Sequence, residues 1–140
     1  MERIGIVACI GRGALGAMAM TGLRQVSTGL GLMPQTPPES MAEATGLLGR
    51  VPPERRTAAI EVAHWGYGAV GGAMYALLPR SVRRLPGVGP LYGVAVWLGF
   101  QVGLAPILGL PQATEASTAQ RGALLADHLL YGLVVGAGTS

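Results

Sequence analysis

Two histidines occupy matching surroundings in the two halves of the chain. The segment His64–Gly68 reads HWGYG, and the segment His128–Gly132 reads HLLYG. One histidine from each of two helices can supply both axial ligands of a b-type haem, and single histidines can ligate chlorophyll. His64 and His128 are therefore candidate cofactor ligands, and the glycine that ends each segment would leave room for a flat macrocycle.

The same two segments support a second interpretation that needs no cofactor. The His-x-x-Tyr spacing puts each histidine on one helix face with Tyr67 or Tyr131. Each pair would then form a local polar cluster that hydrogen-bonds across a helix bundle, with Glu61 or Asp127 beside the imidazole. Both interpretations stay open at the level of the sequence.

Further polar residues lie inside otherwise apolar stretches. An ionisable group at membrane depth costs on the order of 3 kcal/mol unless it is paired. By helix rise, Arg24 and Glu61 come within reach of each other on neighbouring antiparallel helices, so we predict an ion pair between them. That pair would either fix the register of the helices or belong to a proton or ion relay. The candidate intramembrane polar network consists of Arg24, Glu61, Tyr67, Gln101, Asp127 and Tyr131.

The composition indicates that lipid surrounds the elements that carry these residues. Half of the 140 residues are hydrophobic and 12% are charged, whereas soluble domains are about one quarter charged. A membrane helix needs about 20 mostly apolar residues, and four segments qualify, roughly residues 13–33, 57–78, 91–110 and 118–137. The predicted fold is an all-α membrane protein with four transmembrane helices in a single domain, residues 1–140.

The arginines set the expected orientation of these helices. The basic loop Arg80–Arg84 belongs on the cytoplasmic side by the positive-inside rule, and the N-terminal arginines fall on the same side. The two glutamate-containing loops, residues 34–56 and 112–117, then face outward. In the first of them, Met41, Leu47 and Leu48 would form one side of a short interfacial helix. We predict an N-in and C-in multi-pass protein of the bacterial inner membrane.

The two halves look like copies of one helical hairpin. In addition to the histidine segments, Leu30–Gln35 reads LGLMPQ and Leu108–Gln112 reads LGLPQ, in the same order along the chain. We therefore predict a first hairpin over residues 13–78 and a second over residues 90–138. Because each copy has two spans, the copies would share one topology and be related by an axis along the membrane normal.

Glycine pairs at helical spacing predict where helices pack. Small residues four apart let helix backbones approach closely in lipid, where apolar burial gives no driving force. Three pairs have this spacing: Gly68 with Gly72, Gly132 with Gly136, and Gly99 with Gly103. We predict packing for the first two pairs, which are related by the repeat.

The sequence argues against several other classes of protein. The net charge of +3 comes from arginines that flank apolar segments, so we expect no nucleic-acid partner. Cys9 is the single cysteine, which excludes an internal disulfide, and we expect a membrane-buried thiol. No phosphate loop, paired metal-ligand motif or nucleophile–base set is present, so we do not expect an enzyme.

A series of residues between positions 55 and 135 follows the pattern of one family. The series comprises His64, Tyr75, Pro79 with the basic run after it, Gly87, Gln101, Pro106, Gly109, Leu110 and the segment Ala126–His128. It resembles YagU-like bacterial inner-membrane proteins, although this chain lacks the longer soluble insert that such proteins carry between early spans. The resemblance implies a multispan inner-membrane protein and adds little about mechanism.

Taken together, the residues favour a small polytopic membrane protein that acts as a structural or accessory subunit or as a self-associating helix bundle. Its partners would be the lipid bilayer and either other membrane subunits or copies of itself. Two alternatives stay open. One is a haem- or chlorophyll-binding electron-transfer subunit that uses His64 and His128, and the other is a small transporter or proton-coupled channel.

Overall fold

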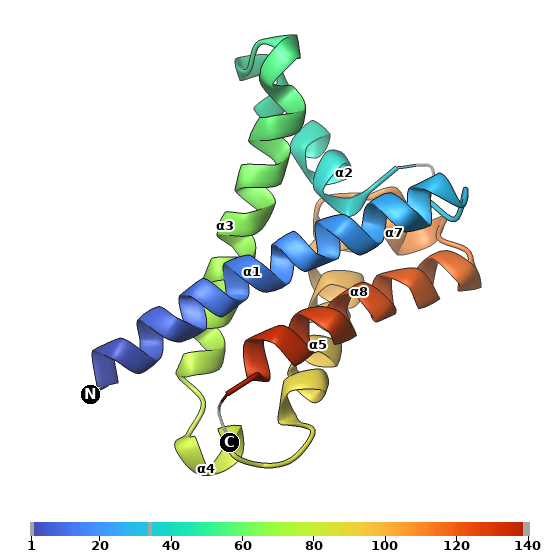
Figure 1. Ribbon diagram of the computed structural model, residues 1–140. Coiled ribbons are helices and arrows are strands. Elements are labelled where there is room, and N and C mark those ends of the chain that lie inside the picture. The colour runs from blue at the N-terminus through green and yellow to red at the C-terminus, as the bar shows by residue number, and fades with distance from the viewer. Residues whose placement is uncertain (1, 34, 139–140) are drawn as a thin grey trace.

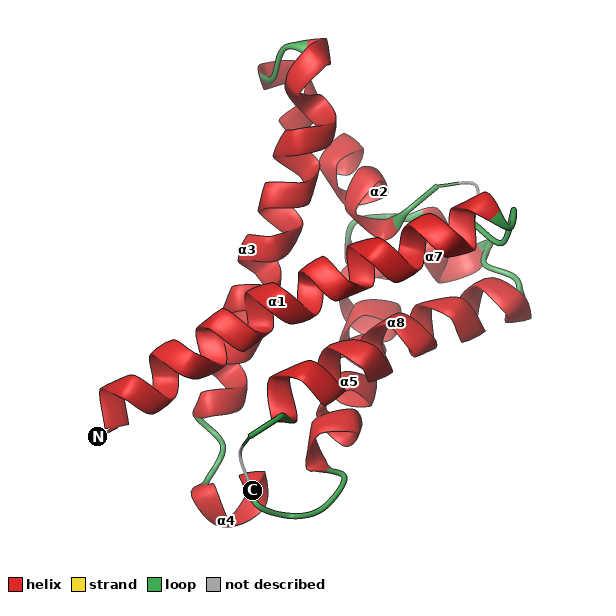
Figure 2. Ribbon diagram, in the orientation of Figure 1, coloured by secondary structure: helices red, strands yellow, loops and turns green. Residues whose placement is uncertain are grey.

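The computed structural model describes residues 2–33 and 35–138, and within them the chain is helical without any strand (Figure 1). Pro34, a member of the expected repeat, lies outside the described residues. Figure 2 shows that short loops join the helices. The long helical segments are α1 (Glu2–Gly29), α3 (Arg56–Ala76), the run formed by α5 (Val88–Gly99), the π-helix η3 (Phe100–Leu104) and α6 (Ala105–Ile107), and α8 (Thr118–Gly136).

The expected segments differ from these helices by a few residues, except for the first. The sequence predicted this segment at roughly residues 13–33, with an alternative start at Ile4, whereas α1 begins at Glu2 and ends at Gly29, so the alternative start is the one that agrees. Arg12 interrupts the apolar sequence but lies within the helix. The chain leaves the helix where Gly31 adopts a positive φ of 73°.

Two helix ends have the same hydrogen-bond pattern. After α1 the Leu32 amide donates to the Ser27 carbonyl oxygen at 3.0 Å, and after α6 the Leu110 amide donates to the Ala105 carbonyl oxygen at 2.8 Å. The glycine before each leucine has a φ of 73° or 65°, a left-handed conformation that glycine adopts at little cost. The two Leu-Gly-Leu segments therefore end their helices in the same way.

Short helices form the connections between the long ones. They are α2 (Pro37–Ala44), η1 (Leu47–Arg50), η2 (Pro53–Arg55), α4 (Arg80–Arg83) and α7 (Pro111–Thr114). The single interfacial helix expected around Met41, Leu47 and Leu48 is instead divided between α2 and η1. The Gln112 side chain of α7 donates to the Ser40 hydroxyl of α2 at 2.9 Å, which joins the two glutamate-containing connections.

The long helices form two pairs that share one contact. α1 packs on α3, α5 packs on α8, and α1 also lies alongside α8 (Figure 1). α3 and α5 have no packing of comparable extent. The N-terminal part of α3 diverges from the other long helices in Figure 1, so the bundle is closed on the side of α1 and α8 and splayed on the side of α3 and α5.

Backbone atoms of glycines form the contact between α1 and α3. A Cβ atom added at Gly13 would meet the Gly68 carbonyl oxygen, and one added at Gly72 would meet the Cys9 carbonyl oxygen. A Cβ atom added at Gly68 would lie 2.5 Å from the Ala17 Cβ atom. The expected packing role of Gly68 and Gly72 is therefore exercised within the chain, where it lets the two helix backbones touch.

The contact between α5 and α8 is built in the same way. A Cβ atom added at Gly132 would meet the Gly89 carbonyl oxygen, and one added at Gly93 would meet the His128 carbonyl oxygen. A Cβ atom added at Gly136 would lie 2.8 Å from the Gly89 Cα atom. Gly132 and Gly136 thus contact α5 as Gly68 and Gly72 contact α1.

Gly99 and Gly103 share this four-residue spacing but do not pack against another helix. A Cβ atom added at either position has no neighbouring atom within 4 Å. Gly89 and Gly93 of the same helical run lie in the interface with α8 instead, on a different face of the helix from Gly99 and Gly103. The four-residue spacing is the same in both pairs, so spacing alone does not identify the packed face.

Several polar side chains are buried inside the bundle, while many large apolar side chains are exposed. Two helical stretches, Gly5–Gly29 and Val88–Ile107, are long and apolar enough to cross a membrane. α3 and α8, the other expected spans, are long enough but less apolar. Large apolar residues are exposed, among them Val7, Leu15, Val70, Leu91, Val102 and Leu133, whereas buried polar residues include Arg24, Ser27, Gln112, Asp127 and His128.

Candidate functional site

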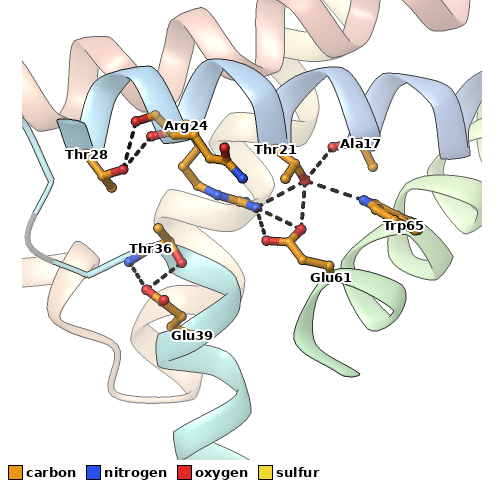
Figure 3. A network of polar contacts seen from close by, with 9 residues as sticks. Ala17, Thr21, Arg24, Thr28, Thr36, Glu39, Glu61 and Trp65 are labelled. Carbon is orange, nitrogen blue, oxygen red and sulfur yellow. Dashed lines mark hydrogen bonds and ion pairs between the residues drawn. The ribbon is translucent and has the colours of Figure 1, made fainter. Parts of the chain in front are cut away.

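Arg24 lies at the centre of a polar cluster between α1 and α3 (Figure 3). Its Nη2 donates to both carboxylate oxygens of Glu61 at 3.2 Å. The Thr21 hydroxyl donates to Glu61 Oε2 at 2.7 Å and accepts from Arg24 Nη2 at 3.2 Å. The Trp65 indole also donates to the Thr21 hydroxyl at 3.4 Å. The structure thus contains the ion pair expected from the sequence and adds two residues to it.

A cavity of about 600 Å³ lies beside this cluster. Residues of α1, α2, α3, α5 and α8 line it. Its lining is mainly apolar. Cavities of this size hold small organic ligands. We name it the α3–α5 chamber, and its apolar lining includes Met20, Val70, Met74, Val96, Phe100 and Leu124.

Six ionisable side chains of the predicted site line the chamber: Arg24, His64, Tyr67, Asp127, His128 and Tyr131. Asp127 is 2% exposed, and its Oδ1 has no hydrogen-bond partner among the described residues. Nδ1 of His64 is also buried without a partner. A buried polar group without a hydrogen bond costs about 1–3 kcal/mol, so both side chains have unused capacity toward a bound molecule.

The His128 ring differs from the His64 ring in its contacts. His128 Nδ1 lies 2.7 Å from the Leu124 carbonyl oxygen, one turn earlier in α8. Because the carbonyl can only accept, Nδ1 carries the proton, and the lone pair of the neutral ring is then on Nε2. The backbone of α8 therefore fixes both the orientation and the tautomer of this ring.

The two tyrosines of the repeated segments have different environments. Tyr131 is 3% exposed, and its hydroxyl donates to the Gly68 carbonyl oxygen of α3 at 2.7 Å. Its ring lies against α1, where a Cβ atom added at Gly16 would be 2.8 Å from the ring. Tyr67 is 48% exposed. The hydroxyl of Tyr131 thus bonds to the backbone of a neighbouring helix, while the Tyr67 side chain extends to the open side of the bundle.

Tyr92 gives the physical reason for this difference. Gly16 follows Gly13 by three positions, and Tyr92 follows Gly89 by three positions, so the two residues correspond in the two glycine contacts. The glycine admits a tyrosine ring between α1 and α8. The Tyr92 ring fills the corresponding space beside α5, and its hydroxyl donates to the Gly71 carbonyl oxygen of α3 at 2.6 Å.

Gln101 lies apart from the other predicted site residues. It is part of the π-helix η3, and it is not among the residues that line the chamber. Its Oε1 is buried without a hydrogen-bond partner among the described residues. The predicted polar network is therefore divided into the Arg24–Glu61 pair, the Asp127 and histidine group, and Gln101 by itself.

Sequence reasoning missed Thr21, Trp65 and Tyr92. Thr21 lies one turn before Arg24 on the same helix face, and that spacing is the signal that could have identified it. Tyr92 acts by occupying space that a glycine leaves open in the other hairpin. Its role follows only from the paired comparison with Gly16, which requires the helix contacts.

The chamber offers a large apolar volume with a few hydrogen-bonding groups. Among the described residues, no group of three or more His, Cys, Asp or Glu side chains is placed to hold a metal ion. No protein-family model, curated protein or solved structure matches the chain. The interpretation of the chamber therefore rests on its own geometry.

Proposed function

We propose that the chain crosses a bacterial inner membrane four times, with both ends on the cytoplasmic side. Two observations support this topology. The two helical stretches that are apolar enough to span are each packed through glycines on one of the two that are less apolar. Glu61 of α3 is paired with Arg24, and Asp127 and His128 of α8 are buried inside the bundle, which lowers their cost in lipid. The resemblance to YagU-like proteins agrees with a multispan arrangement.

We further propose that the protein binds a small organic molecule within the membrane, in the α3–α5 chamber. One observation carries this proposal: His64 and Asp127 each have a buried polar atom without a partner among the described residues, and both residues line an apolar cavity of about 600 Å³. Ligand sites are typically apolar cavities with a few convergent polar groups. The gap between α3 and α5 would give such a molecule access from the bilayer.

Mass spectrometry of molecules that copurify with the protein tests this proposal. Ala95 lines the chamber, whereas Val102 is an exposed residue outside it. Wild-type protein and the Val102→Phe variant should carry a common organic compound at near-equal ratios to protein. Ala95→Phe should carry much less of that compound because its ring fills the chamber. Equal recovery from all three proteins, or none from any, would count against a binding chamber.

A second candidate function, haem binding by His64 and His128, is favoured by the Leu124 contact. Histidines that ligate metals commonly donate their other ring nitrogen to a carbonyl oxygen, as His128 does at 2.7 Å. Both rings line the same chamber. Protein expressed with added haem precursor should then show a Soret band that is lost in His64→Ala and in His128→Ala. The absence of a Soret or chlorin band in the wild type would remove this candidate.

If the protein also acts as an accessory subunit, the glycine pairs are not the surface that contacts its partner. The glycine pairs at 68 and 72 and at 132 and 136 already contact α1 and α5, so they are occupied inside the chain. A partner subunit or a second copy would instead contact exposed apolar faces, such as those around Val102 and Leu133.

A further inference from the structure

Of the two charged residues that line the α3–α5 chamber, one forms an ion pair and the other does not. Arg24 and Asp127 both line it. Arg24 is paired with Glu61 through two contacts of 3.2 Å. Asp127 forms no ion pair among the described residues, and its Oδ1 accepts no hydrogen bond from them. With neutral histidines and an ionised Asp127, the charges of Arg24, Glu61 and Asp127 therefore sum to one negative charge.

This charge discriminates among classes of ligand. An anion would be repelled by Asp127, and the guanidinium that could attract it is already neutralised by Glu61. A neutral molecule would leave the buried carboxylate without a counter-charge, which is costly in a medium of low dielectric constant. A cation would supply the missing charge, so electrostatic complementarity favours a positively charged ligand.

The walls of the chamber favour a cation with apolar substituents. The rings of Tyr67, Tyr92 and Phe100 line it, and the faces of aromatic rings attract cations. The remaining wall is largely aliphatic, with residues such as Met74 and Val96. A small metal ion would find too few oxygen ligands in such a lining, whereas an organic cation would gain from burying its apolar groups.

We propose that the ligand of the chamber is a lipophilic organic cation. Its positive charge lies against the Asp127 carboxylate, and its apolar groups lie between α3 and α5. This inference rests on the proposed function, since it names the ligand class of the same chamber. It adds a positioning role for Glu61, which neutralises Arg24 and thereby leaves Asp127 as the charge that selects the ligand.

Two probes of the same shape and opposite charge test the proposal. Tetraphenylphosphonium is a lipophilic cation, and tetraphenylborate is its anionic counterpart. Equilibrium dialysis of the purified protein in detergent, corrected with empty micelles, measures the binding of each. We expect saturable binding of tetraphenylphosphonium at one molecule per chain and no saturable binding of tetraphenylborate. Asp127→Asn should weaken the binding of tetraphenylphosphonium by about 100-fold, because it removes the charged partner of a buried pair.

Matched variants separate a charge effect from a folding defect. Asp127→Glu keeps the carboxylate and should bind the cation within about tenfold of wild type. Glu115→Gln removes an exposed carboxylate outside the chamber and should bind like wild type. Circular dichroism and gel filtration report whether Asp127→Asn keeps the wild-type helix content and size.

The outcomes distinguish this inference from the proposed function. Equal binding of both probes, unaffected by Asp127→Asn but lost in Ala95→Phe, would overturn the cation inference and keep the chamber as a binding site. Preference for tetraphenylborate would likewise overturn it and assign selection to Arg24. No saturable binding of either probe, together with no copurified compound, would overturn both.

Discussion

The ring of Tyr131 lies against the backbone of Gly16, and this contact joins the two helix pairs. The hydroxyl of the same tyrosine reaches α3 and donates to the Gly68 carbonyl oxygen at 2.7 Å. One side chain of α8 therefore contacts both helices of the other pair. Where α1 has Gly16, α5 has Tyr92, and there the corresponding helices stay apart.

The hydrogen bond of Tyr131 should contribute measurably to stability. Tyr131→Phe removes the bond and leaves the Gly68 carbonyl oxygen without this donor, so we expect a loss of about 1 kcal/mol in the free energy of unfolding. Tyr67→Phe is the matched control, because Tyr67 is 48% exposed and occupies the same place in the other repeated segment. Denaturant titration in detergent, followed by circular dichroism, measures both. Equal stabilities of the two variants would contradict the assigned contact.

The glycine contacts should tolerate no added methyl group. In Gly93→Ala the new Cβ atom meets the His128 carbonyl oxygen, a backbone atom that cannot rotate away. We expect a destabilisation of about 1–3 kcal/mol, the usual cost of overpacking, and a lower Tm. Gly99→Ala adds the same atom on the same helix with nothing within 4 Å, so it should melt at or above the wild-type temperature because alanine favours helix. The reverse order of the two melting temperatures would refute the assigned face.

Removing one partner of the Arg24–Glu61 pair should destabilise the protein more than replacing both partners with apolar residues. Glu61→Gln leaves a buried guanidinium without its counter-charge, and breaking a buried pair costs about 3–5 kcal/mol. The double variant Arg24→Met with Glu61→Met removes both charges and should recover most of that loss. Unfolding free energies of the two single variants and the double variant complete a double-mutant cycle. A double variant as unstable as the sum of the single variants would show that the two residues act independently.

The sequence was sufficient to predict features that depend on local spacing or on burial cost. The pairing of Arg24 with Glu61 follows from helix rise and from the cost of a lone charge in lipid. The approximate extents of α3, α8 and the run from α5 to α6 followed from apolar length, whereas both ends of the segment predicted at residues 13–33 differ from those of α1.

Features that depend on which helix faces which were not predictable from one sequence. Gly99 and Gly103 have the same spacing as Gly89 and Gly93, but only the second pair faces α8. The chamber is also a property of the arrangement, since residues of α1, α2, α3, α5 and α8 line it. Its lining comes from segments distant in the chain, so no local pattern marks it.

Cysteine accessibility provides a test of the proposed topology. In a Cys9→Ala background, Thr114→Cys lies on α7 and Ser81→Cys lies on α4, and both positions are exposed. With an N-in arrangement, a membrane-impermeant maleimide added to intact cells should label Thr114→Cys and leave Ser81→Cys unlabelled until the cells are permeabilised. Labelling of Ser81→Cys but not of Thr114→Cys in intact cells would indicate the opposite orientation. Labelling of both positions would contradict the four-span arrangement.

The glycine contacts also have a mechanical consequence. Inside each helix pair, backbone touches backbone, so no rotamer change can loosen the pair by small steps. Each pair then behaves as a stiff lever, and the freedom of the molecule is concentrated where the pairs meet, along α1 and α8. A change in the width of the chamber would therefore require the two pairs to move relative to each other, against the hydrogen bonds that Tyr131 and Tyr92 make to the backbone of α3.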